Sequence, residues 1–182
     1  MKLRYTILLL ACLISLPQIV MAQQEEAAEP LMNTLEAIHD ITEDFLLASA
    51  EMMDEEMLAY RPSVNVRTSA QIFGHIINAQ FGICTAASGK ENPAEGNYEE
   101  IATTKEHIVK GLKDSFKYCR AVYAEMTDEE SMEMVTFFGG ERRQEMTKAS
   151  VMSFNSTHNY EHYGQLTVYM RINGMTPPSS AN

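Results

Sequence analysis

Positive charge is scarce in this sequence of 182 residues. Lysine and arginine together number 14, against 25 aspartates and glutamates, so the formal net charge at neutral pH is -11. An acidic chain repels the phosphate backbones of DNA and RNA. The composition therefore argues against nucleic acid as a partner.

Cysteine is also rare. The chain has three cysteines, and none of them belongs to a Cys-x-x-Cys motif, so a redox function has little support. Cys84 and Cys119 lie in the part of the chain that we expect to fold. In an oxidising compartment they could pair, but only if their helices bring them to the same height. The alternative, two buried thiols that pack as small hydrophobes, stays open.

Long apolar runs are confined to the N-terminus. Residues 2–4 carry two positive charges, residues 7–19 are mostly apolar, and residues 20–22 read Val-Met-Ala before a polar stretch. This order is typical of a cleaved secretory signal. The apolar run is shorter than the ~20 residues of a spanning helix and contains Pro17, which argues against a permanent anchor. Residues 9–12 resemble a lipobox, but the apolar run continues beyond the cysteine, so a lipoprotein is the less favoured alternative.

Cleavage after Ala22 would leave one domain in residues 23–182, with no membrane attachment and a net charge of -13. We expect the protein to be exported, to the periplasm or the extracellular space. Within the mature chain we expect a flexible lead-in at 23–30, a folded domain at 31–178 and a short tail at 179–182.

Apolar residues recur at helical spacing in four long stretches, without convincing alternating strands or internal repeats. The expected stripes are Leu31, Leu35, Ile38, Ile41 or Thr42, Phe45 and Met52 in the first; Ile72, His75, Ile76, Ala79 and Ile83 in the second; Ile101, Ile108, Leu112, Phe116, Cys119, Val122 or Tyr123 and Met126 in the third; and Val151, Phe154, His158, His162, Leu166 or Gln165, and Tyr169 in the fourth. The pattern predicts an all-α four-helix bundle, a fold that often builds metal sites between facing helices.

Local signals mark the ends of these helices. Pro30 can open the first helix, Thr68 or Ser69 can cap the second, and Thr147 can cap the last. Gly174 is expected to stop the last helix. Residues 134–140 are apolar but too short and glycine-bounded for a helix, so we expect an extended loop across one end of the bundle.

Two histidines share the apolar face of the last helix. His158 and His162 are one turn apart, and burying two imidazoles without a shared partner is costly. Together with His75 they predict a three-histidine site for a divalent metal, with zinc favoured and nickel or iron as alternatives. His75 considered alone is more often a satisfied core residue. His39 and His107 lie off the stripes, and we expect them at the surface.

The residues around these histidines resemble the DinB-like (DinB/YfiT superfamily) proteins. The similarity lies in the run His158-Asn-Tyr-Glu-His162-Tyr-Gly-Gln-Leu with the later Arg171, Gly174 and Pro177, together with Arg61-Pro62 and the segment Thr68 to Ile76. The resemblance covers about residues 31–178. It implies a four-helix bundle with a crossover connection, and a metal site formed by His75, His158 and His162.

The same resemblance implies a metal-dependent enzyme, because many members resemble transferases or isomerases that use a small thiol. An export signal weakens the thiol hypothesis, since an oxidising compartment is poor in small thiols. We therefore expect a transferase or hydrolase that activates a thiol or water for an unknown small-molecule substrate. A non-catalytic metal- or ligand-binding bundle is the alternative. Flat helix faces would also permit a homodimer.

The last helix also contains a protease-like motif and several polar residues near the histidines. Residues 158–162 match H-x-x-E-H, the motif of the inverzincin proteases, but only twenty residues follow His162 and they offer no downstream acidic ligand. A protease is therefore disfavoured. Glu161, Asn155, Asn78 or Tyr160 could support the metal ligands, although spacing assigns none of them, and Glu161 is expected to face solvent.

Overall fold

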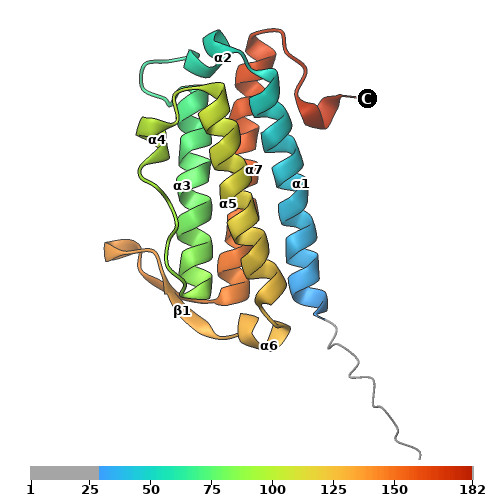
Figure 1. Cartoon of the computed structure of the whole chain (residues 1–182), viewed down its shortest axis with the longest axis vertical. Helices are drawn as coiled ribbons and strands as arrows, with labels where there is room; N and C mark the ends of the chain where they lie inside the picture. The colour runs from blue at the N-terminus through green and yellow to red at the C-terminus, as the bar shows by residue number, and fades with distance from the viewer. Residues whose placement is uncertain (1–28, 182) are drawn as a thin grey trace, which may run out of the picture.

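Four long helices dominate the computed structural model, which describes residues 29–181 (Figure 1). They are α1 (Pro30–Met52), α3 (Ser69–Ser88), α5 (Lys105–Glu125) and α7 (Lys148–Ile172). The prediction of an all-α four-helix bundle is confirmed. The expected signal at residues 1–22 and most of the expected lead-in lie outside the described residues. No helix within residues 29–181 combines the length and the apolar character needed to cross a membrane.

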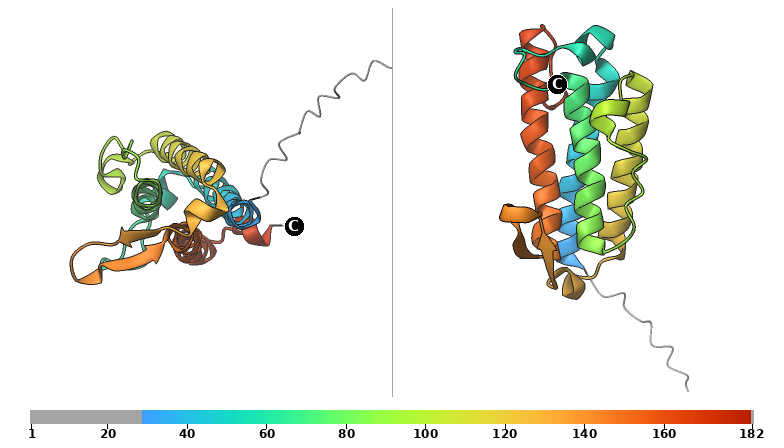
Figure 2. Two further views of the ribbon diagram at one scale, coloured as in Figure 1. Left: turned by 90° about the horizontal axis from the view of Figure 1, so that it is seen from below. Right: turned by 90° about the vertical axis from the view of Figure 1, so that its left-hand side faces the viewer.

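The helices form a ring in which α3 packs against α5 and α7, and α1 packs against the same two helices from the opposite side. The end-on view in Figure 2 shows this arrangement. Helices α3 and α5 run in the same direction, so the chain between them must return along the length of the bundle (Figure 1). This return is the expected crossover connection, and it carries α4 (Tyr98–Ile101).

Short elements close the two ends of the bundle. Helix α2 (Glu55–Ala59) follows α1, and α6 (Asp128–Ser131) follows α5. The strands β1 (Met134–Phe137) and β2 (Gln144–Thr147) pair antiparallel, with the 3-10 turn η1 (Gly140–Arg142) between them. A second 3-10 turn, η2 (Pro178–Ser180), ends the described chain.

The helix starts predicted at Pro30, Thr68 and Thr147 are confirmed. Pro30 stands in the first turn of α1. Thr68 caps α3 in a reciprocal capping box with Gln71. The Thr147 side chain accepts a hydrogen bond from the Ser150 amide at the start of α7. Each cap satisfies amide groups that would otherwise lack an intrahelical partner.

The predicted stripe of α1 is partly wrong. Leu31, Ile38, Ile41 and Met52 are exposed, whereas Thr42, the alternative to Ile41, is buried as expected. The buried face also carries Met32, His39, Leu46, Ser49 and Ala50. His39, expected at the surface, is fully buried, and its Nε2 lies 2.9 Å from Oε1 of Gln80 on α3. Polar side chains can face this core because neighbouring helices supply hydrogen-bond partners.

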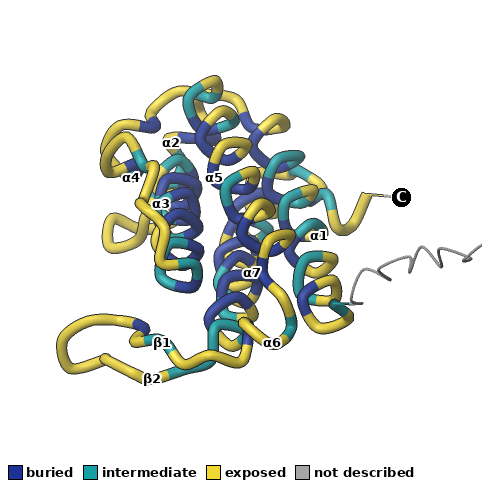
Figure 3. The backbone as a smooth tube through the Cα atoms, turned by 60° about the horizontal axis from the view of Figure 1, so that its bottom comes forward, coloured by how far each residue is buried: buried dark blue, intermediate teal, exposed yellow. Residues whose placement is uncertain are grey.

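The segment after α6 was expected to be an extended loop and is a β-hairpin. Its strands project from one end of the bundle, and their residues are exposed or half-buried apart from one (Figure 3). Phe137 is the buried exception and packs near Phe154 of α7, with ring centroids 5.5 Å apart. Ile101 was also misplaced, because it belongs to α4 and is exposed.

Cys84 of α3 and Cys119 of α5 form a disulfide, with their Cα atoms 5.4 Å apart. The bond joins two adjacent helices inside a cluster of buried apolar side chains. The open question of their pairing is thereby resolved in favour of the disulfide.

Candidate metal centre

Three imidazole rings meet in the groove between α3 and α7. Nε2 of His158 lies 3.1 Å from Nε2 of His75 and 3.1 Å from Nε2 of His162. One nitrogen from each ring lies within 4.8 Å of the others. The structure therefore brings together all three histidines that the sequence singled out.

The helix geometry explains this convergence. His158 and His162 are one turn apart on α7, so their side chains project from the same face. His75 lies in the second turn of α3, and α3 and α7 are adjacent in the ring. Residues separated by more than 80 positions in sequence thus share one site.

The outer nitrogens of two rings are held by side-chain oxygens. Nδ1 of His75 lies 2.8 Å from Oε1 of Glu99, and Nδ1 of His162 lies 3.1 Å from Oε1 of Gln165. Carboxylate and carboxamide oxygens only accept hydrogen bonds, so both Nδ1 atoms carry the proton. In the neutral rings, Nε2 then presents a bare lone pair to the centre of the cluster.

The three rings cannot satisfy all of one another's hydrogen-bonding groups. A proton on Nε2 of His158 could be donated to only one neighbour at a time, and it would leave Nδ1 of the same ring as a bare acceptor. A proton on Nδ1 would instead leave three lone pairs facing one another. That Nδ1 is buried and has no hydrogen-bond partner within residues 29–181. A cation at the centre would satisfy the three Nε2 lone pairs, because tetrahedral zinc with Zn–N bonds of about 2.0–2.1 Å needs nitrogens roughly 3.3 Å apart, close to the 3.1 Å between Nε2 of His158 and each neighbour. It would leave the Nδ1 proton of His158 without a partner among these residues.

The environment keeps two of the rings neutral. Burial, followed by the neighbouring His162, His75 and Arg67, lowers the pKa of His158 to about 3. Burial also lowers the pKa of His162, although its hydrogen bond with Gln165 acts in the opposite direction. Neutral imidazole is the form that binds metals, so His158 and His162 are in the protonation state that a metal ion requires.

Glu99 is positioned by a close contact between α3 and the crossover connection. A side chain at Gly74 would clash with the carbonyl oxygen of Tyr98, so α4 rests directly on the α3 backbone. The Asn78 side chain accepts a hydrogen bond of 2.9 Å from the Tyr98 amide. These contacts place the Glu99 carboxylate beside His75.

Arg67 completes the arrangement around His75. Its Nε donates to Oε2 of Glu99 at 2.9 Å and its Nη2 donates to Oε1 of the same carboxylate at 3.4 Å, so the 3.3 Å approach of Nη2 to the protonated Nδ1 of His75 is a contact without a hydrogen bond. Burial would raise the pKa of Glu99, but the hydrogen bonds from Arg67 and His75 outweigh burial and lower it. The carboxylate is therefore charged and able to hold the His75 proton.

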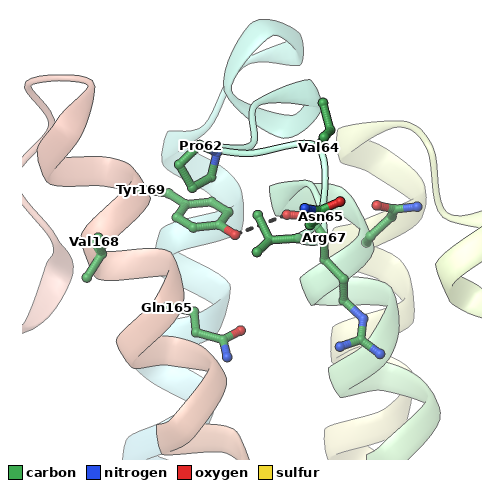
Figure 4. A pocket seen from close by; sticks show the side chains of 9 residues that line it. Pro62, Val64, Asn65, Arg67, Gln165, Val168 and Tyr169 are labelled. Carbon is green, nitrogen blue, oxygen red and sulfur yellow. Dashed lines mark hydrogen bonds between the residues drawn. The ribbon is translucent and has the colours of Figure 1, made fainter.

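A pocket with a volume of about 740 Å³ opens near the histidines, although none of the three is among its lining residues. The loop before α3 forms one wall and the last turns of α7 form the other (Figure 4). Two of its lining residues, Arg67 and Gln165, also contact the Nδ1 atoms of His75 and His162. The His75 side chain is 26% exposed, so the cluster is not sealed in the core.

The supporting residues suggested by the sequence lie elsewhere. Tyr160 and Glu161 are exposed, Asn155 hydrogen-bonds Gln80 in the core, and Asn78 holds α4. The sequence indicated Gln165 only as an alternative to Leu166 on the apolar stripe of the last helix. Spacing could have signalled it, because it lies three positions after His162 on the same face. No sequence pattern indicates Glu99, because it lies near His75 only where the crossover connection passes beside α3.

The four-helix fold agrees with the comparisons with known proteins. The model of the DinB superfamily matches residues 33–166, and the chain belongs to this superfamily. A DinB-like protein from Bacillus cereus ATCC 10987 is 21% identical with a TM-score of 0.65, and the match covers 81% of this chain and 93% of that one. A DinB-like protein from Bacillus subtilis is 16% identical with a TM-score of 0.62, covering 79% and 94%. No curated protein matches.

Proposed function

We propose that this protein is an exported metal-dependent enzyme whose divalent cation is held by His75, His158 and His162. The observation that carries the proposal is the convergence of three Nε2 atoms on one point, where a single proton on His158 can satisfy only one neighbour and a cation would satisfy all three. Three neutral imidazoles with room for a further ligand suit zinc best, with nickel or ferrous iron as alternatives.

The pocket beside the histidines favours catalysis over a purely structural metal. A bound divalent cation with an open position lowers the pKa of a water or thiol that it holds. Glu99 and Gln165 fix the orientation of two ligand rings. The pocket would bind a small-molecule substrate within reach of that position.

The disulfide supports an oxidising compartment as the working location of the protein. Disulfides of this kind are rare in the cytosol, and small thiols are less available outside it. We therefore favour water over a thiol as the activated group, and a hydrolase over a thiol transferase.

Metal analysis of the purified protein tests the proposal. Loading with zinc and exhaustive dialysis should leave one metal ion per chain in the wild type and in the control His107→Ala, which removes a partly exposed histidine of α5. His75→Ala, His158→Ala and His162→Ala should each lose stoichiometric metal while keeping the helical circular dichroism spectrum. Equal metal content in all five proteins would refute the site.

Activity assays then separate the enzyme from a non-catalytic bundle. Zinc-loaded protein should hydrolyse an activated ester faster than the His158→Ala variant does, without added thiol. A strict requirement for added thiol would favour the transferase. Full metal occupancy with no rate above that variant in either assay would favour the binding protein.

A further inference from the structure

The pocket beside the histidines has a distinctive lining. Its walls carry apolar side chains that are exposed in the free protein, with Val64 77% exposed and Val168 52% exposed. Pro62, Val66 and Tyr169 extend the same surface. Exposed apolar groups around a concave site are a common feature of ligand-binding pockets.

The pocket lining carries no acidic side chain, although the molecule as a whole is acidic. The chain carries a net charge of -11, yet the lining residues include no aspartate or glutamate and one charged residue, Arg67. Figure 4 shows its guanidinium on the α3 side and the Gln165 carboxamide across from it on α7.

Arg67 keeps donors available for a ligand. Its Nε and Nη2 contact Glu99 and His75, whereas Nη1 has no hydrogen-bond partner within residues 29–181. The backbone at this position is fixed, because the Tyr169 hydroxyl donates to the Arg67 carbonyl oxygen at 3.1 Å. The guanidinium is therefore pre-oriented, which reduces the entropy lost when a ligand binds.

The charge balance selects the class of ligand. Glu99 neutralises Arg67, and neutral imidazole ligands add no charge, so a divalent cation would leave an excess of about two positive charges beside the pocket. That excess attracts an anion. One free guanidinium nitrogen and three carboxamide side chains, those of Asn65, Gln71 and Gln165, suit a compact single charge, whereas a phosphate dianion usually requires several cationic donors.

We propose that this pocket binds amphiphilic monoanions, in which a carboxylate lies at Arg67 and an apolar chain or ring covers the valine-lined wall. The inference deepens the proposed function, because it names the substrate class of the same site. It rests on the proposed function only for the contribution of the metal. The contact with Arg67 and the apolar wall belong to the protein alone.

The test compares four probes that separate charge from apolar area. Hexanoate, hexan-1-ol, hexylamine and acetate are titrated into metal-free and zinc-loaded protein by isothermal calorimetry. Hexanoate should bind roughly tenfold more tightly than hexan-1-ol, because a hydrogen bond to a charged group is added. Acetate should bind more weakly than hexanoate because it lacks the apolar chain, and hexylamine should bind most weakly of the six-carbon probes.

Variants assign these preferences to residues. Arg67→Gln should remove the advantage of hexanoate over hexan-1-ol, and Arg67→Lys should retain part of it. Val168→Ser should weaken hexanoate and hexan-1-ol together. Arg171→Gln is the control. It removes an exposed arginine that lies on α7, like Val168, and hydrogen-bonds Ser180, so the affinities for the probes should stay unchanged. Metal content and melting temperature are measured for every variant.

The outcomes separate this inference from the metal proposal. Stoichiometric zinc with no preference for hexanoate over hexan-1-ol overturns the inference and leaves the metal site intact. A preference that survives Arg67→Gln but vanishes without zinc also overturns it, because the carboxylate would then bind the metal alone. A preference that depends on Arg67 in a protein that binds no metal supports the pocket and refutes the proposed function.

Discussion

At the scale of single residues, the candidate site depends on oxygens that orient the imidazole rings. Glu99 and Gln165 accept hydrogen bonds from the outer nitrogens of His75 and His162, which leaves the inner nitrogens free of protons. Such partners fix the ring orientation and increase the basicity of the ligand. The chemistry of the cluster therefore extends beyond the three histidines.

Replacement of Glu99 tests this orientation. Glu99→Gln should weaken zinc binding by roughly 10- to 100-fold, because a carboxamide is a poorer acceptor for the His75 proton and loses its ion pair with Arg67. Competition with a chromogenic chelator measures the affinity. Glu100→Gln, at the exposed next position, is the control, and equal affinities of the two variants would contradict the assigned role.

A second residue-scale prediction concerns His39, which is buried away from the cluster. Burial lowers its pKa from 6.5 to about 4, although the hydrogen bond with Gln80 and the charge of Asp40 act in the opposite direction. Between these two values the unfolded chain binds the proton and the folded chain does not. Stability from this group is therefore complete above pH 6.5 and decreases as the pH falls, by about 1.4 kcal/mol per pH unit.

Urea denaturation between pH 7 and pH 4, with a chelator present, measures this effect. The free energy of unfolding should fall more steeply with decreasing pH in the wild type than in His39→Gln, whose side chain does not titrate. Parallel curves for the two proteins would show that His39 does not lose a proton on folding.

At the scale of elements, the sequence predicted what depends on local signals. The four helices, the caps at Thr68 and Thr147 and the stop at Gly174 follow from neighbouring residues, and the structure agrees. The histidine pair on α7 follows from helical spacing. The convergence with His75 could be anticipated from the family resemblance.

Features that depend on packing between elements were not predictable from periodicity. The buried face of α1 includes His39, which becomes acceptable only because Gln80 of α3 provides a partner. Glu99 reaches the site because the crossover lies on Gly74. The hairpin was not recognised because only Phe137 in β1 is buried, which leaves no clear alternation of apolar and polar residues.

Two glycines of α3 test the contact with the crossover. Gly74→Ala should destabilise the fold by about 1–3 kcal/mol and weaken zinc binding, because the new methyl group displaces α4 and the Glu99 that it carries. Gly82→Ala, at an exposed position with open space around it, should stabilise the helix by about 0.5–1 kcal/mol. Thermal unfolding and chelator competition give both quantities, and unchanged zinc affinity in Gly74→Ala would contradict the mechanism.

The disulfide gives another prediction for the helices. Cys84 and Cys119 are 35 positions apart, and closing a loop of this length stabilises a protein by about 4 kcal/mol in the chain-entropy model. Dithiothreitol should therefore lower the melting temperature of the wild type. It should leave the double variant Cys84→Ala/Cys119→Ala unchanged, and an identical response of both proteins would show that the bond does not form in solution.

At the scale of the whole molecule, the bundle provides a rigid frame in which a crossover, a loop and two helices meet at one site. Helices α3 and α7 supply the histidines, α4 supplies Glu99, and the loop before α3 supplies Arg67. Because these parts are distant in sequence, the site exists only in the folded protein. Zinc should therefore stabilise the fold as a ligand that binds the native state alone.

Anomalous X-ray diffraction from crystals of the zinc-loaded protein, recorded on both sides of the zinc absorption edge, tests the central claim most directly. The account predicts one strong anomalous peak per chain, bonded to Nε2 of His75, His158 and His162 at about 2.0–2.1 Å. A cluster of the three rings without such a peak, or a peak bonded to other residues, would contradict it.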